Sequence, residues 1–340
     1  MDSITQIVLG AACGEVVLGK KIGNHALLFG AIGGTIPDLD VFVGKLLFHN
    51  EIDAMAFHRG FMHSFLFAIL ASIGFGLLVF WLYNRGKRYG MTTKKEWMRL
   101  FFASIFTHPI LDSFTAYGTQ LFAPFSNYRV AFNNIAVADP MYTLPFLIAL
   151  IIMMCFKRTS TKRRLFLQIG LGVSSLYMLL TFVNKYHVNN VYKQALADQQ
   201  IEYLRFQTQP TILNNILWYG IAETTDAYYM GFYSILDSEP TIKKWHKLPK
   251  NHELIEGMPK DLETLAWFSD GYYNLNPMDK SDTFLFKDLR YPLMDESDPN
   301  SSIFKFTITK SSDRWEAAPF YVSDINDGAR AAFWARLKGI

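Results

Sequence analysis

The chain has 340 residues, of which 50% are hydrophobic and 19% are charged, and its formal net charge is +3. This composition excludes a water-soluble protein throughout: the first half is as apolar as a membrane-embedded protein, whereas the second half has the mixed polar composition of a soluble domain. A nucleic-acid partner is not expected, because the basic residues crowd two short loops, 85–99 and 157–164, that lie between apolar stretches.

The chain begins with two short apolar segments rich in glycine and alanine, 4–19 and 24–36. No basic residue precedes the first segment, so it does not resemble a cleaved signal peptide and is expected to be retained. Lys20 and Lys21 predict a cytoplasmic turn between the two segments. Asp2 and the residues that follow the second segment, Asp38 and Asp40, are then expected together at the outer side of the membrane.

Four longer stretches that are nearly free of charge follow: 64–83, 100–117, 141–156 and 165–183. Each approaches the ~20 residues that a helix needs to cross a bilayer. Because basic loops face the cytoplasm, the two basic loops fix the direction of these stretches by alternation. Residues 1–183 are therefore predicted to form a membrane all-α helical bundle of about four to six spans in the cytoplasmic (inner) membrane.

The remaining residues, 184–340, are predicted to form a small soluble α+β domain on the extracytoplasmic side. Alternating aromatic and β-branched residues indicate antiparallel strands at 217–222, 228–235, 283–286 and 303–309. Short helices are expected at 261–266 and 327–337, and a loop is expected at 292–302, which is dense in Asp, Pro, Asn and Ser.

Three polar clusters lie inside or beside the apolar segments. Ionisable side chains at membrane depth cost ~2.5–3.5 kcal/mol each on insertion scales, so they are rarely there for packing alone. Histidine and carboxylate are natural ligands of Zn²⁺, with Mn²⁺ as an alternative. The topology places all three clusters toward the outer leaflet. We therefore predict a site for one to three divalent ions, formed by Asp38, Asp40, His58, His63, His108 and Asp112.

His108 and Asp112 have the clearest metal-binding spacing. Four residues apart, they lie about 40° from each other on one helical face, given ~3.6 residues per turn. In a soluble helix such a pair more often forms a hydrogen bond that fixes the helix, but beside two other clusters in a membrane span metal binding is favoured. Asp38 and Asp40 share a turn, in which one can bind metal while the other orients a histidine.

His58 and His63 are five residues apart, which would separate them by about 140° on a regular helix. Gly60 between them predicts that His58 lies on a turn and His63 at the start of the next helix. Arg59 is then near the site, either as a clamp for an anionic oxygen such as a phosphate or as an arginine that snorkels to the interface. Asp139 is expected to be a helix N-cap rather than a site residue.

The three motifs, read in order, resemble the YdjM-type family of inner-membrane, metal-dependent hydrolases: PDLD at 37–40, HRGFMHS at 58–64 and THPILDSFTAYGTQLFAP at 107–124. The resemblance covers roughly residues 1–142 and implies that the six residues above are the metal-site residues. The family is similar in its ligands to the helical zinc phospholipases C and zinc single-strand nucleases. Many members carry a histidine near the start, where this chain has Gln6, a poor zinc ligand; Asp2 is the candidate substitute.

The site is compatible with three functions. The first is a hydrolase that cleaves a phosphoester or lipid-linked substrate at the outer face, with Arg59 stabilising charge and Asp40 or Asp112 as general base. The second is a non-catalytic scaffold with a structural metal and a partner-binding tail. The third, an ion- or proton-coupled transporter, is disfavoured because the inner halves of the spans are almost bare of polar residues. A membrane lipid or lipid-linked molecule is the expected partner; the sequence identifies no protein partner.

Overall fold

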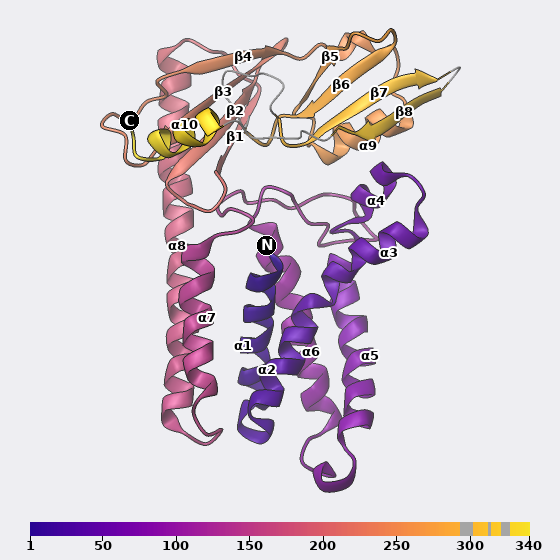
Figure 1. The fold of residues 1–340 in the computed structure, drawn as a ribbon, viewed down its shortest axis with the longest axis vertical. Helices are drawn as coiled ribbons and strands as arrows, with labels where there is room; N and C mark the ends of the chain where they lie inside the picture. Colours follow the sequence, from indigo (N-terminus) through magenta and orange to yellow (C-terminus); the bar gives the residue numbers. More distant parts are fainter. Residues whose placement is uncertain (293–301, 312–313, 321–326) are drawn as a thin grey trace. The chain divides into compact units, whose positions relative to one another are not determined.

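The structure, a computed structural model, describes residues 1–292, 302–311, 314–320 and 327–340, and these form two compact units (Figure 1). The helical unit comprises residues 1–43, 57–183 and 212–214. The sheet unit comprises residues 44–56, 184–211 and 215–340, within the described ranges.

The helical unit is built from apolar helices whose ends are set by capping side chains and by glycine. Asp2 accepts hydrogen bonds from two backbone N–H groups at the start of the first helix, and Thr93 and Glu96 form a reciprocal capping box. Gly23, with φ +59°, separates the first two helices. The helices up to residue 198 are α1 (Ser3–Ile22), α2 (Asn24–Thr35), η1 (Pro37–Leu39), α3 (Asp40–Leu47), α4 (Glu51–Phe57), η2 (Phe61–His63), α5 (Phe65–Tyr83), η3 (Gly86–Arg88), α6 (Lys94–Ser113), α7 (Pro140–Met154) and α8 (Thr161–Asp198).

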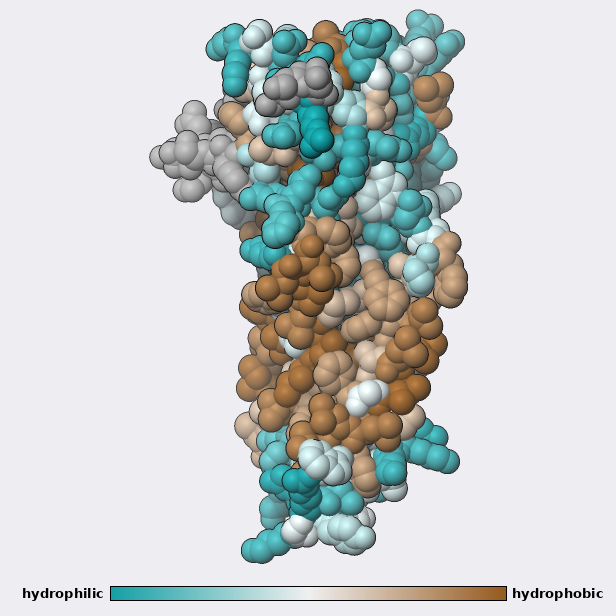
Figure 2. All heavy atoms as spheres, turned by 90° about the vertical axis from the view of Figure 1, so that its right-hand side faces the viewer, coloured by the Kyte–Doolittle hydropathy of each residue, from teal (hydrophilic) through white to brown (hydrophobic). Residues whose placement is uncertain are grey.

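Among the described residues, three helices are long and apolar enough to cross a membrane: α1, α5 and α8. A fourth candidate is α2 together with residues 37–47, which meet at a bend of 44°. Helix α7 is apolar but has only 15 residues, and α6 begins with the charged residues Lys94, Lys95 and Glu96. On the face of the molecule shown in Figure 2, apolar residues form a broad band. A membrane protein with three or four candidate spans is therefore supported, while the predicted range of four to six spans is not confirmed.

Helix α1 packs against α2, α6 and α7. Its contact with α2 is close because both helices carry glycines: a Cβ added to Gly10 would lie 2.4 Å from the carbonyl oxygen of Gly30, and one added to Gly30 would lie 2.2 Å from that of Gly10. Small residues in this pattern let membrane helices approach to backbone contact. The glycine-rich composition of these segments therefore has a packing cause.

A buried ion pair joins α1 to α8. The Nε and Nη2 atoms of Arg163 donate to the two carboxylate oxygens of Glu15 at 2.7 and 2.6 Å, and both residues are buried. Arg163 Nη1 also donates to Asn24 Oδ1 at 2.8 Å. The sequence groups Arg163 with the basic loop 157–164, but in the structure Glu15 neutralises its charge.

Removing one member of this pair should strongly destabilise the helical unit. Glu15→Gln leaves the guanidinium of Arg163 buried without a counter-charge, which costs about 3–5 kcal/mol. The double variant Glu15→Leu/Arg163→Leu should recover much of that loss, because an apolar pair of similar volume avoids the desolvation of both charges. Thermal unfolding of the purified protein in detergent measures the difference. A double variant no more stable than Glu15→Gln would contradict this account of the pair.

The sheet unit contains two four-stranded antiparallel sheets, with strand orders β1-β2-β3-β4 and β5-β6-β7-β8. Their strands are β1 (Arg205–Pro210), β2 (Leu217–Glu223), β3 (Ala227–Ser234), β4 (Trp245–Pro249), β5 (Tyr273–Pro277), β6 (Thr283–Asp288), β7 (Lys305–Ser311) and β8 (Arg314–Pro319). The helices of this unit that follow residue 198 are η4 (His252–Leu254), α9 (Lys260–Phe268) and α10 (Asp327–Leu337). The antiparallel sheets and the two predicted helices are confirmed, whereas most of the loop expected at 292–302 lies outside the described residues.

The strands that the sequence does not predict share two features. They are β1, β4, β5 and β8, which are the edges of the two sheets, and each ends on a proline. Proline is confined to sheet edges because it has no N–H group to donate to a neighbouring strand. Edge strands are also more polar, so their alternation of apolar and polar residues is weak.

Candidate metal centre

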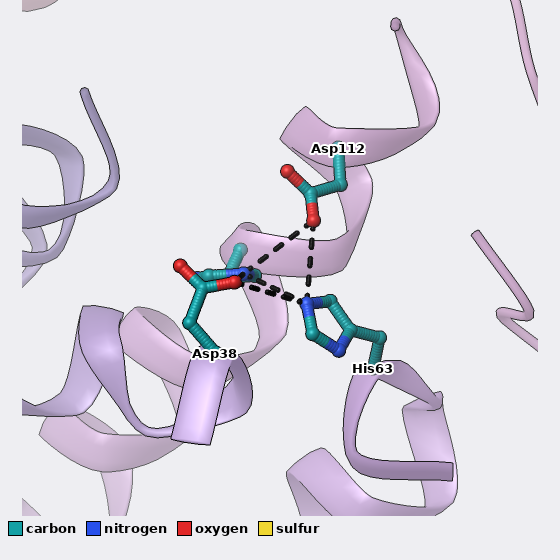
Figure 3. Close-up of side chains that lie close together, drawn as sticks. Asp38, His63 and Asp112 are labelled. Atoms are coloured by element: carbon teal, nitrogen blue, oxygen red, sulfur yellow. Dashed lines mark hydrogen bonds and ion pairs between the residues drawn. The ribbon is translucent and has the colours of Figure 1, made fainter. Parts of the chain in front are cut away.

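Four of the six predicted ligands come together in the helical unit (Figure 3). Asp38 lies in η1, at the bend between α2 and α3, and His63 ends η2. His108 and Asp112 lie one turn apart on α6, which continues through Pro109. One nitrogen or oxygen atom from each of the four lies within 4.8 Å of those of the other three.

Five of the six distances between these donor atoms are close to the edges of a tetrahedral site for one ion, and the sixth, between Asp38 and Asp112, is at most 4.8 Å. His63 Nε2 and His108 Nε2 are 3.1 Å apart. Asp112 Oδ2 lies 3.3 Å from His63 Nε2 and 3.5 Å from His108 Nε2. Asp38 Oδ1 lies 3.5 and 3.4 Å from the same two nitrogens. With metal–ligand bonds of ~2.0–2.1 Å, the edges of a tetrahedral zinc site are about 3.3 Å long.

The hydrogen-bonding pattern shows that a cation fits between these atoms. His108 Nδ1 lies 2.6 Å from the carbonyl oxygen of Gly34, which can only accept, so Nδ1 carries the hydrogen. His63 Nδ1 lies 3.0 Å from Asp40 Oδ2, which favours the same tautomer. In neutral rings both Nε2 atoms are then acceptors, and the buried Asp112 Oδ2 accepts no hydrogen bond from any described residue. A divalent metal would satisfy all three atoms.

The electrostatics of His63 indicate the same need for positive charge. Burial alone would lower its pKa, but the carboxylates of Asp112, Asp38 and Asp40 outweigh burial and raise the pKa of His63 to about 10. The surrounding carboxylates therefore favour a cation at this position.

Asp40 and His58 lie behind the four donor atoms rather than among them. Asp40 is fully buried; its Oδ1 lies 2.8 Å from His58 Nδ1, and its Oδ2 accepts a hydrogen bond from the backbone N–H of Arg59 at 2.9 Å. Through its contact with His63, Asp40 can orient a ligand histidine, as carboxylates do behind many metal sites. Burial lowers the pKa of His58, against the opposing effect of Asp40.

Arg59 is buried beside the site, so its side chain does not snorkel to the interface. Its Nε lies 3.2 Å from Asp112 Oδ2, and its Nη1 donates to Thr115 Oγ1 at 2.9 Å. Its backbone has φ +58°, an unfavourable conformation for arginine that surrounding contacts must maintain. These contacts include its N–H on Asp40 and its carbonyl oxygen, which accepts from Gln120 N at 3.0 Å.

Three further polar residues, Asp2, Asp139 and Gln6, are not among the four donor residues. Asp2 and Asp139 both cap helices, and Asp139 Oδ2 also accepts from Tyr177 OH at 2.9 Å. Gln6 borders the site, since its Nε2 donates to Asp112 Oδ1 at 2.9 Å. Sequence reasoning considered Gln6 only as a poor ligand, although a buried amide in an apolar span is itself a sign of a polar partner.

A family model described as YdjM inner membrane protein matches residues 1–188, more than half of the chain and all four donor residues. The chain belongs to the YdjM inner membrane protein family. It is also similar to YfhP of Bacillus subtilis (strain 168), with 25% identity over 242 residues that cover 68% of each protein. YfhP is described as an uncharacterized protein and supplies no activity. No solved structure matches the chain significantly.

Metal analysis tests the geometry of this YdjM-family site. Wild-type protein purified in detergent should contain about one divalent ion per chain, and His63→Ala and Asp112→Ala should lose it, because each removes one of four donors. Asp40→Asn should weaken binding by about 10–100-fold without abolishing it, as expected for a group that orients a ligand. Asp2→Asn, which changes the cap of α1 and a contact with Thr5 but removes none of the four donors, is the control and should retain the ion. Wild type without stoichiometric metal, or His63→Ala with it, would refute the site.

Proposed function

We propose that this YdjM-family protein is an integral-membrane, metal-dependent hydrolase that cleaves a phosphoester or lipid-linked substrate at the outer face of the membrane. The observation that carries the proposal is the buried guanidinium of Arg59, 3.2 Å from a donor oxygen of Asp112. A metal that only holds a fold gains nothing from a second positive charge beside it, because like charges repel. An anionic phosphoryl oxygen would be attracted by both charges.

The donor set suits Zn²⁺, with Mn²⁺ as the alternative, because it combines two imidazoles with two carboxylates. When bound, such an ion would polarise the phosphoester and lower the pKa of a water molecule toward 7. The Asp38 side chain is 27% exposed, whereas those of the other three donor residues are at most 1% exposed. The approach for substrate and water is therefore on the side of Asp38.

Of the polar groups near the donors, His58 is the best proton acceptor. Asp112 Oδ2 faces the donor nitrogens, and Asp40 is fully buried and already accepts from His58 and from the N–H of Arg59. His58 directs Nδ1 to Asp40, and its side chain is 23% exposed. Its lowered pKa favours the neutral ring, which leaves Nε2 as an acceptor. We therefore assign Asp40 a positioning role and Asp112 a ligand role.

An amphipathic substrate fits the surroundings of Asp38. Leu39 and Phe42, which adjoin Asp38 and Asp40 in the chain, are 46% and 66% exposed. Exposed apolar side chains beside a charged site suit a ligand with an acyl or isoprenoid chain and a phosphate group. A membrane lipid or lipid-linked molecule is the partner proposed here, and no role for nucleic acid is proposed.

A scaffold with a structural metal is the second candidate, because four protein donors are also the number found in structural zinc sites. Arg59 argues against it. The transporter alternative is weakened further by Glu15, the acidic residue within α1: both of its oxygens are taken up by Arg163, so it is not a free relay group.

Variants of the two neighbouring histidines should separate metal binding from catalysis. His63→Ala should lose the metal and all hydrolysis. His58→Ala should retain the metal but lose activity toward a phosphodiester or phospholipid substrate by about 10²–10⁴-fold, the typical contribution of a general base. Metal content and hydrolysis are measured on the same preparations. If His58→Ala loses metal as completely as His63→Ala, His58 is a ligand; if wild type holds metal but hydrolyses none of a broad phosphoester panel, the scaffold is favoured.

We also propose that the sheet unit is extracytoplasmic, because the basic loops 85–99 and 157–164 favour the cytoplasmic side. Lys280 is exposed in the sheet unit. In a chain with both native cysteines replaced, Lys280→Cys should react with a membrane-impermeant thiol reagent in intact cells whose inner membrane is sealed. A cysteine at Lys87, in the basic loop, should react only after lysis. The reverse pattern would contradict the proposed orientation.

A further inference from the structure

A turn that follows α6 exposes two large aromatic side chains, those of Phe122 and Phe125. Residues 113–128 contain no charged side chain. Within them, Leu121 and Ala123 are buried, whereas Phe122 and Phe125 are 52% and 84% exposed. The turn is closed by hydrogen bonds from Phe125 N and Ser126 N to Phe122 O, at 3.0 and 3.2 Å. These bonds satisfy two N–H groups of the turn, which lowers the cost of bringing its backbone to the edge of an apolar environment.

The ring of Phe122 continues a row of aromatic side chains that begins on α6. Phe102, which is 39% exposed, stacks on Phe106 with ring centroids 4.9 Å apart. Phe106 stacks on Phe65, the first residue of α5, also at 4.9 Å. Phe65 contacts Phe122 edge to face at 5.7 Å. The apolar outer surface of the helices therefore extends onto the turn without interruption.

The turn also lies at the level where the hydrocarbon core should end. Helix α5 has 19 residues, and α-helices rise ~1.5 Å per residue, so it is about as long as the ~30 Å hydrocarbon core is thick. Its first residue, Phe65, donates its N–H to Leu121 O at 3.0 Å. The turn is therefore fixed at one end of a candidate span, where exposed aromatic rings meet the boundary between acyl chains and headgroups.

We infer that the turn 121–125 inserts Phe122 and Phe125 into the bilayer, where their partner is the acyl region of the lipid. Gln120, which directly precedes the turn, donates its N–H to the carbonyl oxygen of Arg59 at 3.0 Å and so connects the turn to the metal site. Lipid contact and the conformation of Arg59 are thus connected through three consecutive residues. This inference depends on the membrane character of the helical unit and not on the proposed hydrolase activity.

Site-directed spin labelling in liposomes tests the insertion. In a background with Cys13→Ala and Cys155→Ala, a nitroxide is attached at Phe125→Cys. Two reference labels are placed at Leu77→Cys, an exposed position within α5, and Tyr89→Cys, an exposed position in the polar loop after it. The Phe125 label should lie between the two references, with more frequent collisions with oxygen and several-fold fewer collisions with a water-soluble nickel complex than the Tyr89 label.

Two results would overturn the inference. Nickel collisions as frequent as at Tyr89 would place the turn in water. Rare collisions with both reagents would show that protein covers the turn, either the sheet unit or a second copy of the chain. Metal content checks that each variant is folded, since none of the substituted positions supplies a donor atom. A Phe125→Cys protein without metal is replaced by Phe122→Cys, for which the same outcomes apply.

Discussion

The contact between the Nε2 atoms of His63 and His108, 3.1 Å apart, is the interaction on which the polar structure of the helical unit depends. Two imidazole nitrogens that both accept at the same point repel each other unless a proton or a metal ion lies between them. The neighbouring groups all maintain this arrangement. The carbonyl of Gly34 fixes one ring, Asp40 fixes the other, and Gln6 holds the oxygen of Asp112 that faces away from them.

The carbonyl of Gly34 reaches His108 because of the packing of small residues. A Cβ on Gly34 would lie 2.5 Å from the backbone oxygen of Gln6, and one on Gly33 would lie 2.8 Å from Ser104 Cβ. The end of α2 is thus in contact with α1 and α6 at once. The chain then bends by 44° before α3, which places Asp38 at the break. A substitution at either of these glycines, neither of which supplies a donor atom, would therefore move the site.

The sequence predicts which residues form the site better than it predicts how these residues contact one another. Motif spacing brings His108 and Asp112 to one helical face, and the topology brings Asp38 and His63 to the same level. It does not show that His58 turns to Asp40, because that depends on the backbone between the two histidines. The sequence suggests Gly60 as the special residue there, but the positive φ belongs to Arg59, while Gly60 has φ −91°. The positive φ of Arg59 is explained by the contacts of its backbone with Asp40 and Gln120, which the sequence does not reveal.

Charge balance gives a reason for a single ion. The groups in and immediately behind the site include three carboxylates, those of Asp38, Asp40 and Asp112, the guanidinium of Arg59, and the buried amino group of Met1, which contacts Asp112. One divalent ion brings this set within one charge of neutrality, whereas two or three ions would leave a larger excess of positive charge in a buried region, which is costly. Asp40 and His58, which would have to supply further donors, are engaged with each other. If the protein is the hydrolase proposed above, Arg59 would provide beside Asp112 the positive charge that a second metal provides in multinuclear phosphoesterases.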